Sequence, residues 1–164
     1  ASFQRSGGDI CRTLHTLFQT GQFQDNKGNK FKRPFNFLVS SLRATGATIN
    51  RTNDSWHLDR HPLGKYLLRM GDVPFQYPTP DGYPQEISPW LGTLLWRWDF
   101  ALKLSQNEIE GIKTDKQQEE NVGGADQLLA HFLGRRATDA EQETYGESGN
   151  GLALLLASPS FQMC

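Results

Sequence analysis

The sequence predicts a mostly α-helical fold: an irregular orthogonal helical domain with a long proline- and aromatic-rich crossover loop. Two observations lead to this prediction. Apolar residues recur at spacings of three and four in several segments, and these segments begin and end at residues that favour helix termini. No segment alternates between apolar and polar residues over the length of a strand. Because 164 residues can bury a core, we predict a single helical domain over 1–164.

Two helices are predicted in the first part of the chain. The first has a capping sequence that starts at Ser6, and it ends at Gly21. The second begins at Pro34, whose missing N–H costs nothing in a first helical turn, and it ends at Gly46. The residues predicted to face the core are Ile10, Leu14, Leu17 and Phe18 in the first helix, and Phe35, Leu38, Val39 and Leu42 in the second.

A third helix is predicted to end at Gly71, and the strongest helical pattern starts at Ser88-Pro89. Trp96 and Trp98 in this last helix lie about 160° apart around its axis, so they cannot share a face. We expect Trp98 to anchor the core and Trp96 to be more exposed. The residues predicted to point inward are Leu63, Tyr66, Leu67 and Met70 in the third helix, and Leu91, Leu94, Leu95, Trp98 and Leu102 in the strongest one; Arg97, Asp99 and Lys103 are placed on other sides.

Two long segments interrupt these helices. Five prolines in 71–89 exclude a helix there and predict a Pro-rich loop. The segment 106–123 is polar and charged, which predicts a mobile loop. Thr138 and Glu141 form a capping box for a following helix. Short helices are predicted around 126–133, 139–145 and 152–157.

Composition and spacing argue against several classes of function. The net charge of −1 is unlike that of a nucleic-acid binder, and no apolar run approaches the ~18 residues of a membrane span. The glycine patterns of phosphate and dinucleotide sites are missing, so we predict no cofactor.

Metal and disulfide chemistry have little support in the sequence. His57 and His61 have a spacing that suits half of a zinc site, but no further ligand cluster accompanies them, so we predict no metal. Cys11 and Cys164 would enclose almost the whole chain if they paired; two unrelated thiols are the favoured interpretation.

Five stretches carry a resemblance to a known family. They are SGGDICRTLHTLFQTGQF, FKRPFNFLVSSLRATGA, MGDVPFQYPTPDGYP with Trp90 after it, LLWRWDFAL and LLLASPSFQ. Together they resemble the C-terminal part of the bacterial family called domain of unknown function 1800, in the family's order and over most of the chain except 106–123. The resemblance implies the C-terminal portion of a longer, exported bacterial protein, periplasmic or secreted, with no agreed activity and no agreed catalytic residues.

The Pro-rich loop contains the best candidates for ligand binding. Tyr77, Tyr83 and Trp90 offer flat apolar faces that can stack on sugars or other rings, and Asp81 adds a carboxylate. The alternative, which we favour, is a stapling loop that pins a long crossover between helices.

Two arginines next to aromatic residues are further candidates. Arg33 and Arg97, paired with Asp81 or Asp99, could hold an anionic ligand through the guanidinium group. The alternative is a set of internal salt bridges that tie the helices to the loop.

Two functional hypotheses follow. The first is a non-catalytic module that binds a protein partner, a missing N-terminal segment, or a polymer such as a carbohydrate. The second is a hydrolase-like enzyme that acts on an extracellular polymer with Asp81, Glu86 or Asp99 as acid or base. If another segment normally covers this chain, an exposed apolar patch is expected around Phe75, Tyr77, Tyr83, Trp90 and Trp96.

Overall fold

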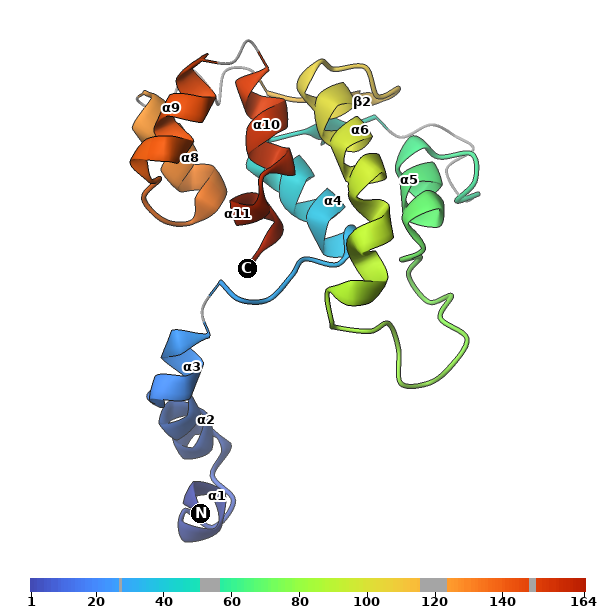
Figure 1. Ribbon diagram of the computed structural model, residues 1–164. Coiled ribbons are helices and arrows are strands. Elements are labelled where there is room, and N and C mark those ends of the chain that lie inside the picture. Colours follow the sequence, from blue (N-terminus) through green and yellow to red (C-terminus); the bar gives the residue numbers. More distant parts are fainter. Residues whose placement is uncertain (27, 51–56, 116–123, 148–149) are drawn as a thin grey trace. The chain divides into compact units, whose positions relative to one another are not determined.

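The computed structural model describes residues 1–26, 28–50, 57–115, 124–147 and 150–164. It divides into two compact units, one formed by Ala1–Lys30 with Met163–Cys164 and the other by Phe31–Gln162. Helices dominate, and the strands of the described part form one two-stranded sheet, so the mostly α prediction is confirmed (Figure 1). The single domain over 1–164 stays a prediction.

The smaller unit consists of three short helices, α1 (Ser2–Arg5), α2 (Ile10–Phe18) and α3 (Gly21–Asp25). The first predicted helix exists as α2, but its cap is Asp9, which accepts a hydrogen bond from the Arg12 N–H at 3.0 Å. Ser6 instead ends α1, because Gly7 and Gly8 adopt positive φ and break the helix. Gly21 opens α3, where Thr20 is the cap.

The apolar side of α2 was expected to face a core, and this expectation is wrong. Three helices of four to nine residues are too short to enclose an interior around α2, and none of its residues is buried. The apolar residues in question are Ile10, Leu14, Leu17 and Phe18, with exposed fractions between 43% and 68%.

The larger unit contains the hydrophobic core, and its central element is α6 (Leu94–Ser105). Figure 1 shows α6 running between α5 and α10, and it packs against both. The other elements are α4 (Pro34–Ala44), β1 (Thr48–Ile49), α5 (Pro62–Met70), the 3₁₀ helix η1 (Ser88–Thr93), β2 (Ile112–Lys113), α8 (Ala125–Leu133), α9 (Asp139–Glu147), α10 (Gly151–Ala157) and α11 (Pro159–Gln162). Strands β1 and β2 pair antiparallel, with Thr48 opposite Lys113.

Helices α4 and α5 follow their sequence signals closely. Pro34 occupies the first turn of α4, and Gly71 ends α5 in the left-handed conformation at φ 72°, as predicted. Leu38 is buried as expected, whereas Phe35 is exposed and Phe37 takes the core position. The buried residues of α4, which are Pro34, Phe37, Leu38 and Ser41, each lie one position before a predicted residue, so the predicted stripe was rotated by about 100° around the helix axis. On α5 the predicted residues Tyr66, Leu67 and Met70 are all buried.

The inward face of α6 was predicted wrongly. The buried residues of this helix are Arg97, Phe100, Ala101 and Leu104, which face the core between α5 and α10. Both sides of α6 are apolar, so the spacing alone does not decide which side packs. The expected inward residues, Leu91, Leu94, Leu95, Trp98 and Leu102, are exposed by 37–73%.

The two tryptophans of α6 are reversed accordingly. Trp98 is exposed by 45% and does not anchor the core. Trp96 is partly buried, packs against the core cluster, and lies under the guanidinium of Arg69 at 4.5 Å from the ring centre. The reversal follows from burial of the Arg97 side of the helix.

Part of the segment expected to be a mobile loop packs into the core. Ile109 and Ile112 belong to the core, and Ile112 also lies in β2. The Asn107 side chain accepts a hydrogen bond from the Thr114 N–H at 2.7 Å and orders the chain before 115. Residues 116–123 of the predicted loop lie outside the described residues.

The capping box before α9 is confirmed. The Glu141 carboxylate accepts the Thr138 N–H at 2.8 Å, and the Thr138 hydroxyl accepts the Glu141 N–H at 3.4 Å. Arg135 donates to both carboxylate oxygens, at 2.8 and 3.0 Å, and the Ser160 hydroxyl donates to one of them. The bonds from Arg135, followed by those from Ser160 and Thr138, hold the pKa of Glu141 well below its usual range, although burial acts the other way.

This lowered pKa predicts an acid-dependent loss of stability. Above about pH 5 the unfolded chain and the folded protein both carry an ionised Glu141, and its hydrogen bonds contribute fully. At lower pH only the unfolded chain takes up the proton readily, so the free energy of unfolding falls. We expect Glu141→Gln to cost about 1–2 kcal/mol at pH 7 and much less near pH 3. Urea unfolding across this range measures it; a gap that is constant with pH would contradict the assignment.

Candidate functional site

The loop between α5 and η1 gathers an aromatic cluster around Tyr83. The ring of Tyr83 lies 4.6 Å from that of Tyr77 and 6.0 Å from that of Trp90, centre to centre. The guanidinium of Arg33 lies over the same ring at 5.6 Å. Four of the six residues proposed from the sequence are therefore brought together. We call Arg33, Tyr77, Tyr83 and Trp90 the loop cluster.

Hydrogen bonds fix the loop cluster to its own backbone. The Tyr83 hydroxyl donates to the Val73 carbonyl at 2.8 Å and accepts the Val73 N–H at 3.1 Å. The indole N–H of Trp90 donates to the Pro84 carbonyl at 3.1 Å, and Trp90 itself is buried. The two Tyr83 bonds tie the beginning of the loop to its second half, and the Trp90 bond ties the end of the loop to η1. The favoured interpretation of the loop as a structural staple agrees with this geometry.

One face of the loop stays accessible. Tyr77 is half-buried, and Phe75 two residues earlier is fully exposed with a φ of 64°. A positive φ is strained for a bulky side chain, at a cost of about 1–3 kcal/mol. Of the apolar patch expected from the sequence, Phe75 is exposed, whereas Trp90 and most of Trp96 are covered.

Arg97 lies in the core of the larger unit and not on the loop surface. Its guanidinium donates to the Thr93 hydroxyl at 3.0 Å, the Lys32 carbonyl at 2.9 Å and the Gln162 side-chain oxygen at 3.0 Å. The rings of Phe31 and Phe37 lie 4.5 and 5.1 Å from it. Arg97 therefore joins η1, the segment before α4 and α11. Among the described residues, Arg97 forms no ion pair.

The electrostatics of this buried arginine reflect its burial. Desolvation lowers the pKa of Arg97 to about 10, and the charge of Asp72 partly opposes that shift. Asp72 is also buried, and its carboxylate accepts the Phe35 N–H at the start of α4 at 2.9 Å. Sequence reasoning missed Asp72; its place directly after Gly71, where a helix ends, was the available signal.

Two of the three carboxylates considered for hydrolysis, Asp81 and Asp99, have lowered pKa values. Asp81 is fully exposed and accepts a hydrogen bond from the Thr79 hydroxyl, which lowers its pKa. Burial acts to raise the pKa of Asp99, but bonds from Tyr66 and Lys103 outweigh it and lower the pKa. Glu86 is exposed. A general acid needs a raised pKa, so neither Asp81 nor Asp99 has the required property.

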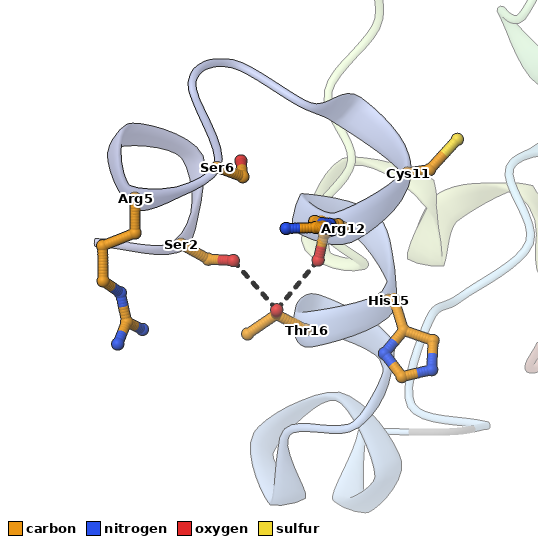
Figure 2. A pocket seen from close by; sticks show the side chains of 7 residues that line it. All are labelled: Ser2, Arg5, Ser6, Cys11, Arg12, His15 and Thr16. Carbon is orange, nitrogen blue, oxygen red and sulfur yellow. Dashed lines mark hydrogen bonds between the residues drawn. The ribbon is translucent and has the colours of Figure 1, made fainter.

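A concave region lies within the smaller unit, between α1 and α2 (Figure 2). Its volume is about 570 Å³. The Thr16 hydroxyl bonds to the Ser2 hydroxyl at 3.0 Å and donates to the Arg12 carbonyl at 2.8 Å. Cys11 and His15 project from another side of α2, away from this pair. The residues that line the pocket are Ser2, Arg5, Ser6, Cys11, Arg12, His15 and Thr16, most of them exposed.

Another pocket, of about 270 Å³, lies between α9, α10 and α11 in the larger unit. Leu154, Leu155 and Tyr145 supply apolar walls, and Glu141 and Ser160 form a polar end. The Glu141 carboxylate already accepts hydrogen bonds from Arg135, Thr138 and Ser160. This pocket was not foreseen, because it depends on how α9 packs against α10.

Other sequence candidates are separate from these regions. His61 caps α5 by accepting the Leu63 N–H at 3.2 Å through its side chain. Cys11 and Cys164 are free, exposed thiols. In the part of the chain that the structure describes, no group of three or more histidine, cysteine or acidic side chains could hold a metal ion. The helices within that part include none long and apolar enough to cross a membrane.

Fold and loop cluster together define a small helical protein with an anchored aromatic loop. The sequence matches the model of the family described as "Protein of unknown function (DUF1800)" over residues 1–163. The chain belongs to this family, which confirms the resemblance drawn from its motifs. No curated protein and no solved structure matches the chain.

Proposed function

We propose that this protein is a non-catalytic binding module that recognises a carbohydrate-like polymer through the accessible face of its Pro-rich loop. The contact residues in this proposal are Tyr77 and Phe75, supported from behind by Tyr83 and Arg33. The observation that carries it is a loop tied down at both ends that still presents aromatic faces. Rigid aromatic side chains lose little entropy when a ligand binds, and their faces suit flat apolar ring surfaces.

The conformation of Phe75 supports a binding role. Its side chain gains nothing from packing, and its backbone is strained, so the folded protein alone gives no reason for this residue. A surface that contacts a ligand provides such a reason. The proposal places the module outside the cytoplasm, as the family resemblance implies, where structural polysaccharides are available. The lowered pKa values of Asp81 and Asp99 give the hydrolase hypothesis no comparable support.

Removing an accessible ring is expected to weaken binding. Insoluble polysaccharides, including peptidoglycan, chitin and cellulose, can be incubated with the protein and sedimented, and the bound fraction measured. We expect Tyr77→Ala and Phe75→Ala each to weaken binding about tenfold, since a lost stacking contact costs about 1 kcal/mol or more. The matched control is Phe3→Ala, an exposed phenylalanine in α1, which should bind normally. Failure of the wild type to bind any of these polymers would overturn the proposal.

A variant that lacks the Tyr83 hydroxyl distinguishes anchoring of the loop from direct contact with the polymer. Tyr83→Phe keeps the ring but removes the two hydrogen bonds to Val73. We therefore expect thermal unfolding to show a loss of about 1–3 kcal/mol, with polymer binding retained at low temperature. A variant that binds less but unfolds normally would place the hydroxyl in the binding contact and contradict its anchoring role.

A further inference from the structure

Arg33 is the charged member of the loop cluster, and its guanidinium makes no hydrogen bond in the part of the chain that the structure describes. It lies over the Tyr83 ring at 5.6 Å, its Nε atom is buried without a hydrogen-bond partner, and the residue as a whole is half-buried. Taking a charged group out of water is costly unless acceptors replace the lost water. A guanidinium held in this way can take its acceptors from a ligand.

The two carboxylates that the sequence suggested as partners of Arg33 are engaged elsewhere. Asp99 forms an ion pair with Lys103 at 3.0 Å, and Asp81 accepts a hydrogen bond from the Thr79 hydroxyl. Internal salt bridges were the alternative interpretation of Arg33, and none of the ion pairs among the described residues includes it. The structure therefore favours the other interpretation, in which this arginine meets an anionic ligand.

The charges at the start of α4 also favour an additional anion. Arg33 directly precedes this helix, whose first turn contains no acidic residue, and the N-terminus of a helix carries partial positive charge. Among the described residues, Asp72 is the one buried acidic side chain. Its carboxylate accepts the Phe35 N–H at 2.9 Å, and its charge acts on the buried Arg97. Asp72 thus serves the helix end and Arg97, and Arg33 adds a second guanidinium without a second buried carboxylate.

The neighbouring aromatic ring indicates what kind of anion fits. Tyr77 and Arg33 both contact the Tyr83 ring, so a sugar stacked on Tyr77 brings its substituents close to the guanidinium. We propose that the polymer bound by the Pro-rich loop is an acidic polysaccharide whose carboxylate or sulfate groups pair with Arg33. This inference rests on the proposed function and names its ligand class. Arg33 then supports the Tyr83 ring and also donates hydrogen bonds from its guanidinium, whose planar fork matches the paired oxygens of such groups.

Matched pairs of charged and neutral polymers test the requirement for an acidic group. Polygalacturonate and its methyl ester share one backbone and differ in the free carboxylate, and dextran sulfate and dextran form the corresponding pair for sulfate. Affinity electrophoresis of the full 164-residue chain in gels that contain each polymer measures binding. We expect the acidic member of at least one pair to bind about tenfold more tightly than its neutral counterpart. Equal binding within both pairs, or binding to neither acidic polymer, would overturn the inference.

Substitution of Arg33 tests the residue itself. We expect Arg33→Gln to lose the roughly tenfold preference for the acidic polymer and to keep the affinity for the neutral one. The ratio of the two affinities is the readout, because partial unfolding would lower both equally. The matched control is Arg69→Gln, which removes an arginine stacked on Trp96 at 4.5 Å outside the loop and should keep the preference. A preference that survives in Arg33→Gln, or is lost equally in Arg69→Gln, would overturn the role of Arg33.

Tyr77→Ala distinguishes failure of this inference from failure of the proposed function. Loss of the Tyr77 ring should weaken binding to the acidic and the neutral polymer alike, because stacking does not depend on the acidic group. If Tyr77→Ala weakens binding while Arg33→Gln leaves the preference unchanged, the acidic ligand class is wrong and the aromatic binding surface stands. If Tyr77→Ala binds every polymer like the wild type, the proposed function is wrong, and this inference is overturned with it.

Discussion

Replacement of Arg97 by alanine is expected to lower the free energy of unfolding by about 3–5 kcal/mol. The guanidinium is completely buried and supplies donors to Thr93, to the Lys32 carbonyl and to the Gln162 side chain. Without it, buried acceptors lose their partners and a large cavity opens beside Phe31 and Phe37. Urea unfolding followed by circular dichroism measures the loss.

A second substitution at Arg97 distinguishes the stability contributed by its hydrogen bonds from that contributed by the volume it fills. Arg97→Met fills much of the space but supplies no donors, so we expect it to be more stable than Arg97→Ala and less stable than the wild type. The control is Arg12→Ala, because this arginine is exposed and its removal should cost no more than about 0.5 kcal/mol. A loss at Arg97 as small as that at Arg12 would show that the buried guanidinium does not organise the core.

Phe100→Ala is expected to cost about 3–5 kcal/mol, the usual range for a buried phenylalanine. Phe100 is completely buried, and its ring makes edge contacts with Tyr66 at 5.1 Å and Phe37 at 5.9 Å between centres. These three aromatic side chains join α4, α5 and α6. Truncation of the central one leaves a cavity that the neighbouring rings cannot close. Chemical unfolding at equilibrium gives the measurement.

Trp98→Ala is the matched comparison for Phe100→Ala. Trp98 lies on the same helix but on its exposed side, so its removal should cost less than about 1 kcal/mol. Equal losses at Phe100 and Trp98 would contradict the orientation of α6 described above.

Local signals in the sequence predicted several helix boundaries correctly. Pro34 at the start of α4, Gly71 after α5 and the box of Thr138 and Glu141 before α9 all lie where they were expected. Each of these signals acts through the backbone of its own turn. It therefore holds in any tertiary arrangement that keeps the helix. Three boundaries were predicted wrongly. Ser6 was displaced as a cap by two glycines with positive φ immediately after it, and Gly21 opens α3 instead of ending α2. The helix predicted from Ser88 starts as the 3₁₀ helix η1 and becomes α-helical at Leu94.

The loop cluster was predictable in its members but not in its geometry. Tyr77, Tyr83 and Trp90 are close in sequence and bounded by prolines, so their proximity follows from the short chain between them. Arg33 joins them from the start of α4. The sequence suggested that Arg33 pairs with a carboxylate, whereas in the structure it lies over the Tyr83 ring. The separation of Arg97 from Asp81 likewise depends on the packing of α6 and not on spacing.

The sequence by itself determined the helical class of this protein, the limits of α4, the end of α5, and the rigid aromatic loop between α5 and η1. Only the tertiary structure decided which side of α6 is buried. Both sides are apolar, so a 3.6-residue period describes either orientation equally well. The buried side is the one that contains Arg97, because Lys32 and Gln162, each 65 residues away, supply acceptors that compensate the guanidinium for its lost water.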